Sequence, residues 1–210
     1  MTAPRQRGAP PPAGAGRVAV QPLAGYAPLA ARWLGALGES RRDLLETVAD
    51  LTDDELHTAL VPGAHSIAAL LRHVAGVELW WVRTVLLQSP LDPGTAERYG
   101  LSQGPGTILP PPREWGLPQF LALLDEAHGE TCRAFRGLDD LALQRPDRPW
   151  PGGGRTISPE WILYNLLDHL ANHRGQIAML KRLVRHRGGE AAEPASELRR
   201  RGRETGPDAP

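Results

Sequence analysis

Four long stretches of this chain place apolar residues three and four positions apart, which is the spacing of an amphipathic α-helix. These stretches cover residues 28–50, 66–88, 118–136 and 158–187. Valine, isoleucine and threonine do not alternate with polar residues over a length that would predict a sheet. Because amphipathic helices bury their apolar faces against one another, the sequence predicts an all-α protein built as a four-helix bundle.

Capping residues support the starts of two of these helices. Ser66 precedes the second stretch, and Ser158-Pro159-Glu160 opens the fourth with a capping hydroxyl, a proline and an acid in the first turn. The segment 52–55, Thr-Asp-Asp-Glu, has the form of a capping box. It predicts a short additional helix that ends near Leu60.

The two ends of the chain differ from its middle. Residues 1–24 are dominated by proline, glycine and alanine, and 188–210 also lacks apolar periodicity, so we expect two disordered tails around a folded domain at 25–187. Inside the domain, the connection 89–117 is rich in glycine and proline. A connection of this length allows a crossover between parallel helices, and it can also form a wall or lid over a site.

The charge balance limits the partners of the chain. Lysine and arginine total 24, as do aspartate and glutamate, so the formal net charge is zero. A protein that binds nucleic acid usually has a basic surplus, so we expect no nucleic-acid partner and interpret the basic residues at 181–187 as a solvated helix end. No apolar run reaches the roughly 18 residues that a transmembrane helix requires, so we also expect no membrane partner.

The chain has one cysteine, Cys132. A single cysteine excludes an internal disulfide and agrees with a reducing compartment, so we expect a cytoplasmic protein. Cys132 lies among apolar residues of the third helical stretch. Nothing in the sequence around it indicates an activated nucleophile.

Two histidines mark the fourth helical stretch. At about 100° per residue, His169 and His173 both fall on its apolar stripe, one turn apart. An unpaired buried polar group costs about 1–3 kcal/mol, and a shared divalent metal ion would satisfy both rings. Two ligands hold an ion weakly, so a third is expected from a facing helix, where His73 is the best candidate. The alternative, histidines that only pack in the core, stays open on spacing alone.

The same residues resemble a known family. His169-Leu-Ala-Asn-His173-Arg174-Gly175-Gln176 is similar to the signature of the DinB-like (DinB/YfiT) metalloprotein superfamily, and the segment 63–78 resembles its second helix. The resemblance covers about residues 26–184. Relatives often have a second histidine where this chain has Asn172, a position outside the metal triad.

The resemblance implies a bundle of up-down-down-up topology with a long crossover between the second and third helices. It also implies a divalent ion, commonly zinc or nickel, on His73, His169 and His173, and frequent homodimers. Some relatives are transferases or isomerases that use a low-molecular-weight thiol such as mycothiol or bacillithiol. Four further residues are candidates for supporting the ligands or lining the pocket: Glu78, Asp168, Arg174 and Gln176.

Three hypotheses for the function follow. In the first, the metal favours the thiolate form of a thiol cofactor, which attacks a small electrophilic substrate in a pocket between the second and fourth helices. In the second, a non-catalytic, stress-associated protein uses the ion only to stabilise the bundle. In the third, the chain is a metal-free helical dimer. A catalytic site should leave a coordination position open, whereas a structural site should be closed by a fourth ligand, for which His65 and Glu78 are candidates.

Overall fold

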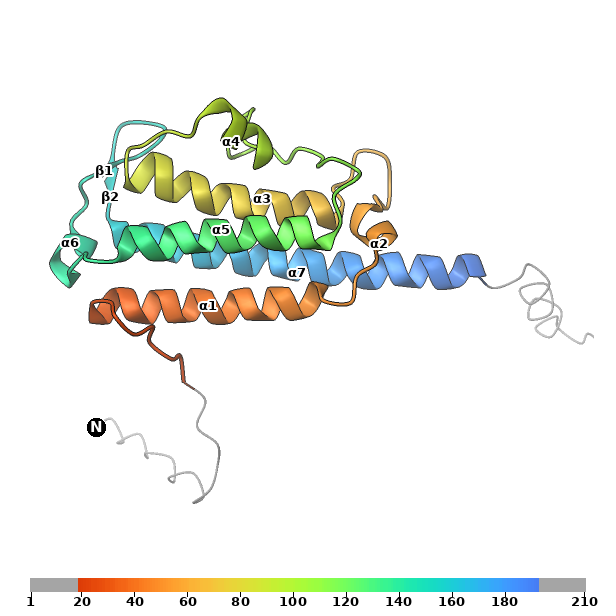
Figure 1. Ribbon diagram of the computed structural model, residues 1–210, viewed down its shortest axis with the longest axis horizontal. Helices are drawn as coiled ribbons and strands as arrows, with labels where there is room; N and C mark the ends of the chain where they lie inside the picture. Colours follow the sequence, from red (N-terminus) through yellow and green to blue (C-terminus); the bar gives the residue numbers. More distant parts are fainter. Residues whose placement is uncertain (1–18, 193–210) are drawn as a thin grey trace, which may run out of the picture.

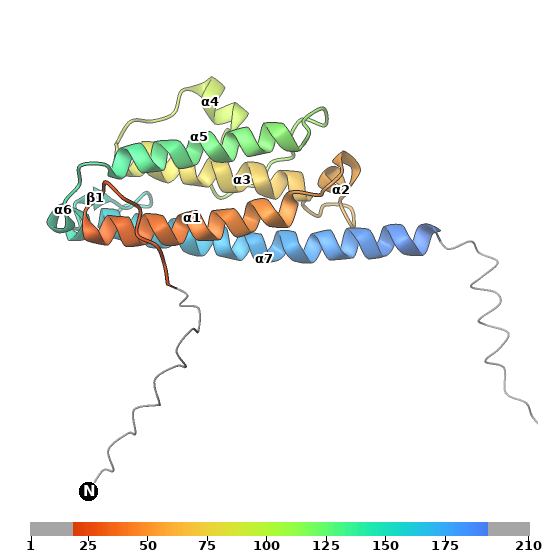
Figure 2. The same cartoon turned by 60° about the horizontal axis from the view of Figure 1, so that its bottom comes forward.

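The computed structural model describes residues 19–192, with side chains to residue 188. Four long helices form its body: α1 (Pro28–Val48), α3 (Ile67–Trp80), α5 (Leu117–Phe135) and α7 (Pro159–Ala192). They pack in two layers, with α1 beside α7 and α3 beside α5, and α3 also contacts α7 (Figures 1 and 2). The predicted all-α four-helix bundle is confirmed.

The direction of each helix can be followed in the colours of Figure 1. α1 and α7 run one way, and α3 and α5 run the opposite way, so that α3 and α5 are parallel neighbours. This is the up-down-down-up order that the family resemblance implies. The chain needs the long connection after α3 because it must return along the bundle before α5 can start beside α3.

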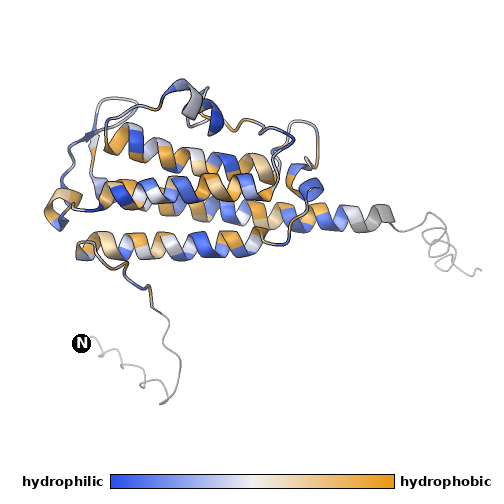
Figure 3. Ribbon diagram, in the orientation of Figure 1, coloured by the Kyte–Doolittle hydropathy of each residue, from blue (hydrophilic) through white to orange (hydrophobic). Residues whose placement is uncertain are grey.

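The core lies between the two layers. Hydrophobic and hydrophilic residues are interspersed along the long helices, as expected when one face of each helix is apolar (Figure 3). Burial of a leucine or phenylalanine side chain contributes about 1.5–3 kcal/mol, so a continuous apolar core accounts for most of the stabilisation. The largest fully buried side chains come from α1, α3, α5 and α7 and from two short helices: Leu34, Leu37, Leu44, Leu56, Ile67, Leu71, Phe120, Leu123, Leu124, Phe135, Leu143 and Ile162.

The predicted caps are present. The Ser66 hydroxyl accepts a hydrogen bond from the Ala69 amide at 3.2 Å, and α3 begins at the next residue. Thr52 and Glu55 form the predicted capping box of α2 (Asp53–His57). At the start of α7, the Ser158 hydroxyl accepts from the Trp161 amide at 3.2 Å. Local hydrogen bonding therefore sets where these helices begin.

Several short elements were not predicted. The second helical stretch does not stay α-helical to residue 88, because α3 passes into a π-helical segment, η1 (Trp81–Leu86). The others are α4 (Pro93–Arg98), α6 (Asp140–Gln144) and the strands β1 (Arg148–Pro149) and β2 (Thr156–Ile157), which pair antiparallel. Elements of two to six residues are too short to show a hydrophobic period.

The last helix is longer than predicted. α7 continues through Gly188 to Ala192, beyond the expected end at Arg187. A helix already formed adds residues without a new nucleation step, and this offsets the cost of about 1 kcal/mol for each glycine. Of the tails predicted to be disordered, 1–24 and 188–210, the parts 1–18 and 193–210 lie outside the described residues. Among the described helices, none combines the length and apolar character that crossing a membrane demands.

The charge pattern predicted a solvated basic end for α7. In the structure, basic side chains of this end instead contact the end of α1 and α2. Lys181 donates a hydrogen bond to the Thr47 carbonyl at 2.7 Å and pairs with Asp50. Arg185 pairs with Glu55 at 2.6 Å and with Asp50 at 3.0 Å. These contacts join the extension of α7 to the end of α1 and to α2, although exposed ion pairs of this kind contribute only about 0–1 kcal/mol each.

A buried arginine holds the long connection against α3. Arg72 is 4% exposed, and its guanidinium donates to the carbonyls of Arg98 and Pro110, both at 3.0 Å, and of Glu97. One turn further along α3, Gly76 allows close approach of the connection, since a Cβ there would lie 2.5 Å from the Tyr99 carbonyl oxygen. The glycine-rich connection is therefore a defined wall on the α3 side of the bundle.

Candidate metal centre

The three predicted histidines meet where α3 crosses α7. His73 projects from the middle of α3, and His169 and His173 project from α7 one turn apart. A separation of four residues places both α7 rings on one helix face. Packing of α3 against α7 then brings the third ring to them, although His73 and His169 are 96 residues apart in the chain.

The geometry of the cluster suits one metal ion. One candidate ligand atom from each ring lies within 4.8 Å of the others, and the Nε2 atoms of His73 and His169 are 3.2 Å apart. Two nitrogens that bind a tetrahedral zinc at 2.0–2.1 Å are about 3.3 Å apart. The ring centroids lie 4.4–5.0 Å from one another. The residues present therefore fit a three-histidine site for a divalent ion.

Gln176 orients one of the three rings. Its side-chain Oε1 lies 2.8 Å from His173 Nδ1. Because an amide oxygen only accepts hydrogen bonds, this contact places the proton on Nδ1 and leaves the Nε2 lone pair free for a metal. A hydrogen bond to the non-ligating nitrogen is the usual support of a metal-binding histidine.

The other three candidate supporting residues lie away from the cluster. Arg174 pairs with Asp43 and so connects α7 to α1. Asp168 is exposed on α7. Glu78 is buried on α3 but contacts His128 and Thr131 of α5. The structure thus brings Gln176 to the histidines and does not bring Asp168, Arg174 or Glu78 to them.

The environment keeps the histidines neutral. Burial, with the charges of His173 and His65, lowers the pKa of His73 to about 4. Burial, with the charges of His173 and His73, lowers the pKa of His169 to about 3. Burial also lowers the pKa of His173, against the opposing effect of the hydrogen bond that His173 donates to Gln176. Neutral imidazoles are the form that binds a metal, so at pH 7 an ion need not displace protons from this site.

Among the residues with described side chains, the cluster has three candidate ligands and no fourth histidine, cysteine, aspartate or glutamate. Of the two residues considered as a closing ligand, Glu78 is engaged with α5 and His65 is exposed in the loop before α3. Three protein ligands leave a tetrahedral ion one open position, which is the arrangement of catalytic rather than structural zinc sites.

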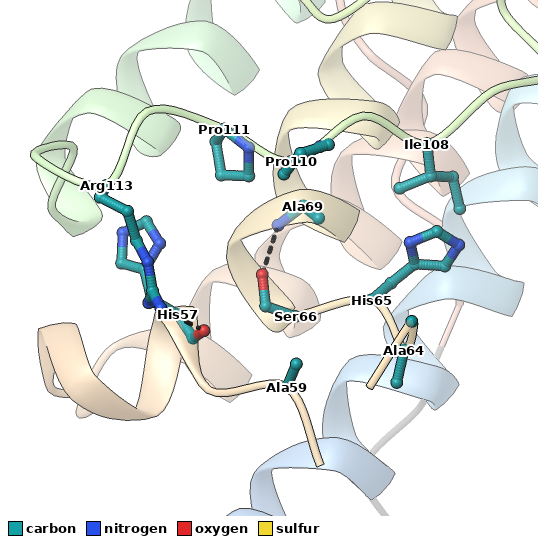
Figure 4. A pocket seen from close by; sticks show the side chains of 11 residues that line it. His57, Ala59, Ala64, His65, Ser66, Ala69, Ile108, Pro110, Pro111 and Arg113 are labelled. Carbon is teal, nitrogen blue, oxygen red and sulfur yellow. Dashed lines mark hydrogen bonds between the residues drawn. The ribbon is translucent and has the colours of Figure 1, made fainter. Parts of the chain in front are cut away.

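A cavity of about 400 Å³ lies one turn from the cluster, at the start of α3. Ala69, four residues before His73, forms part of its floor. The cavity lies between the loop 59–66 and the connection at 108–113, rather than between the second and fourth long helices as predicted. Figure 4 shows His57 and Arg113 on one side and His65 and Ile108 on the other.

The cavity contributes polar groups that the sequence patterns did not reveal. His57 Nε2 donates to the Trp115 carbonyl at 2.7 Å, and Arg113 Nη1 donates to the His57 carbonyl at 3.3 Å. His65 lies close enough to the histidine cluster for its charge to lower the pKa values of His73 and His173. His57 and Arg113 lie in short or irregular segments, where no periodic signal identifies a functional residue.

The lowered pKa values predict how the stability of the metal-free protein depends on pH. As pH falls from about 6.5 toward about 4, the unfolded chain binds protons on His73 and His169 while the folded chain does not. The unfolded state then binds more protons, so the free energy of unfolding must fall with pH over this window.

Urea unfolding of chelator-treated protein at pH 7, 6 and 5 measures this effect. A triple variant, H73Q/H169Q/H173Q, should lose a large part of the pH dependence, because glutamine does not titrate. Equal slopes in the wild type and the triple variant would contradict the prediction.

The chain is similar to known proteins. The family model described as mycothiol-S-transferase matches residues 33–186. A protein of Geobacillus kaustophilus (strain HTA426) that carries the provisional name of a metal-dependent hydrolase is 24% identical over 155 residues, which cover 71% of this chain and 83% of that protein. A solved structure, a conserved protein from Enterococcus faecalis, aligns with a TM-score of 0.55 and 19% identity, covering 72% of this chain and 94% of that one. This last likeness concerns the fold alone.

Proposed function

Because the chain belongs to the mycothiol-S-transferase family, whose model spans residues 33–186, we propose that it transfers a low-molecular-weight thiol to a small electrophile in a metal-dependent reaction. The family match confirms the resemblance to the DinB-like superfamily. The observation that carries the proposal is the cluster of three neutral histidines with an open coordination position. The relative named as a metal-dependent hydrolase supports a role for the metal.

In this proposal, the residues at the metal site have separate roles. His73, His169 and His173 hold the ion, with zinc or nickel the expected occupant because imidazole suits both. A divalent ion at this site supplies positive charge that favours the thiolate form of a bound thiol. Gln176 keeps the His173 lone pair directed at the site. The transfer forms a carbon–sulfur bond and expels the leaving group of the electrophile.

The cavity beside the cluster is proposed to bind the polar part of the thiol. Arg113 and the His65 imidazole provide hydrogen-bond donors, while Ile108, Pro110 and Pro111 form an apolar wall. A thiol of the mycothiol or bacillithiol type carries hydroxyl and carbonyl groups that accept hydrogen bonds from such donors. The residue that lines the cavity farthest along α3, Ala69, lies four residues before His73.

A direct assay tests the function. Full-length protein, stripped with chelator and reloaded with zinc or nickel, is incubated with mycothiol or bacillithiol and a panel of alkyl and aryl halides, and thioether products are detected by mass spectrometry. Metal-dependent product formation supports the transferase. If the loaded protein binds metal but yields no thioether, while the metal raises the unfolding temperature, the non-catalytic alternative with a structural ion holds instead.

A cavity variant separates substrate binding from chemistry. Arg113→Ala is expected to raise the KM for the thiol roughly tenfold with kcat nearly unchanged, because loss of one charged hydrogen bond costs about 1.5 kcal/mol of uniform binding. Arg182→Ala, which removes an exposed arginine from α7, is the matched control. Steady-state kinetics with the thiol as the varied substrate measure this effect. A KM equal to that of the control would exclude Arg113 from thiol binding.

The homodimer and the cytoplasmic location expected from the sequence remain proposals. Three large apolar side chains on α7 support the dimer, since Tyr164 is 49%, Met179 50% and Leu183 46% exposed. Burial of Met179 and Leu183, one turn apart, against a second copy would remove this surface from water.

A further inference from the structure

A second group of reactive side chains lies between α3 and α5, apart from the histidine cluster. Cys132 and His128 are one turn apart on α5, and the Cys132 Sγ atom lies 3.7 Å from His128 Nε2. The other ring nitrogen, Nδ1, lies 3.3 Å from Glu78 Oε1 on α3. A thiol, an imidazole and a carboxylate are thus in contact in the order that nucleophilic catalysis uses.

Glu78 is the fixed end of this arrangement. The residue is 5% exposed, and its Oε1 accepts a hydrogen bond from the Thr131 hydroxyl at 2.8 Å. A buried carboxylate needs a charged or hydrogen-bonding partner, and the ion pair with His128 supplies one. Because the carboxylate accepts from Nδ1–H, Nε2 is the nitrogen left to interact with the thiol.

The charges at this site favour the thiolate. Burial and the negative charge of Glu78 raise the pKa of Cys132, but the hydrogen bond and the charge of His128 and the hydrogen bond from Tyr26 outweigh them and bring the pKa below its usual value. Burial lowers the pKa of His128, yet Cys132 and Glu78 together raise it to about 9. The groups that face the thiol are therefore His128 on α5, Glu78 on α3 and Tyr26 before α1, with Arg136 against the Tyr26 ring. This corrects the expectation that Cys132 is not activated.

The two sites use different faces of α3. Glu78 is five residues after His73, which is about 140° further around the helix, and it faces α5 whereas His73 faces α7. Neither Cys132 nor His128 belongs to the histidine cluster. Cys132 is half-buried rather than enclosed in the core.

We propose that Cys132, activated by the His128 imidazolium that Glu78 holds in place, is a site of mixed-disulfide formation with low-molecular-weight disulfides. The Cys132 thiolate attacks one sulfur of the disulfide, a new Sγ–S bond forms, and the original S–S bond breaks. The departing thiolate takes a proton from the His128 imidazolium, so no oxidant other than the disulfide is needed. Because the chain has no second cysteine, the mixed disulfide persists until another thiol attacks it.

The test compares the wild type with His128→Gln, Glu78→Gln and Cys132→Ser in the full-length, metal-free protein. Oxidised glutathione is the probe, and intact-protein mass spectrometry follows the adduct between pH 5 and 9. We expect the wild type to react with an apparent pKa clearly below the value of about 8.5 for a free cysteine. In H128Q the apparent pKa should rise toward that value, and the rate at pH 6 should fall roughly tenfold.

Controls keep the result interpretable. Glu130→Gln removes an acid of α5 that pairs with Arg133 and should leave the pH profile unchanged. C132S should form no adduct and still bind one metal ion, which separates this site from the proposed transferase. Circular dichroism verifies that H128Q is folded, and E78Q provides a second variant if it is not. A wild-type apparent pKa near 8.5, or identical profiles in the wild type and both folded variants, would overturn the proposal.

Discussion

Replacing His169 with alanine is expected to abolish metal binding. The protein should carry about one zinc or nickel ion per chain after loading, because three imidazoles converge on one position. Removal of one leaves two ligands, and the affinity should fall by at least the roughly 100-fold that loss of a supporting hydrogen bond can already cost. His73→Ala and His173→Ala should behave in the same way, and transferase activity should disappear with the metal.

Elemental analysis of the untagged protein, with isothermal titration of the metal-free form, measures this effect. Gln176→Ala provides a graded comparison, since it leaves three ligands but removes the hydrogen bond at 2.8 Å to His173, and it should weaken affinity by about 10- to 100-fold. His186→Ala, further along α7, is the control for loss of a histidine outside the cluster. Full metal content in each single ligand variant, or none in the wild type after soaking, would refute the site.

Replacing Arg72 with methionine is expected to cost about 3 kcal/mol of unfolding free energy. The substitution keeps an apolar stem in α3 but leaves the carbonyls of Glu97, Arg98 and Pro110 without their donor. Each buried acceptor left unsatisfied costs about 1–3 kcal/mol, partly recovered by water at the edge of the connection. Because Pro110 also lines the cavity, the KM for the thiol should rise as well.

Urea unfolding and limited proteolysis of the connection test this prediction. Arg72→Lys should be intermediate, because an ammonium group cannot place donors as the planar guanidinium does. Arg42→Met, at an exposed position of α1, is the control and should change the unfolding free energy by less than about 0.5 kcal/mol. An unfolding free energy of R72M equal to that of the control would show that the connection does not depend on Arg72.

The four-helix bundle could be predicted because the sequence signals for each helix lie within a few residues of one another. Apolar spacing and capping residues such as Ser66 and Thr52 act within one or two helical turns, and they placed all four long helices. The same periodicity put His169 and His173 on one buried face. Short elements do not show this periodicity. The formation of η1, α4 and α6 depends on the residues that pack against them, which their own sequences do not reveal.

The supporting residues of the metal site were less predictable. Of the four candidates, Gln176 contacts a ligand because it lies three residues after His173 on the same helix face. Arg174 and Asp168 point elsewhere, and Glu78 is on α3 but faces α5. Nearness in the chain does not determine which side of a helix a residue presents.

The sequence by itself therefore determined the helical class, the position of the helices and the pairing of two histidines on one of them, because each depends on interactions within a few residues. His73 was the best third candidate from the sequence, but only the tertiary structure brings its ring to that pair. Only the tertiary structure, too, makes the connection with Arg72 a wall of the cavity beside it and lets Glu78 reach His128 next to Cys132. These contacts join residues 25 to 96 positions apart. They exist only after the packing of α3 against α5 and α7 has brought those helices together.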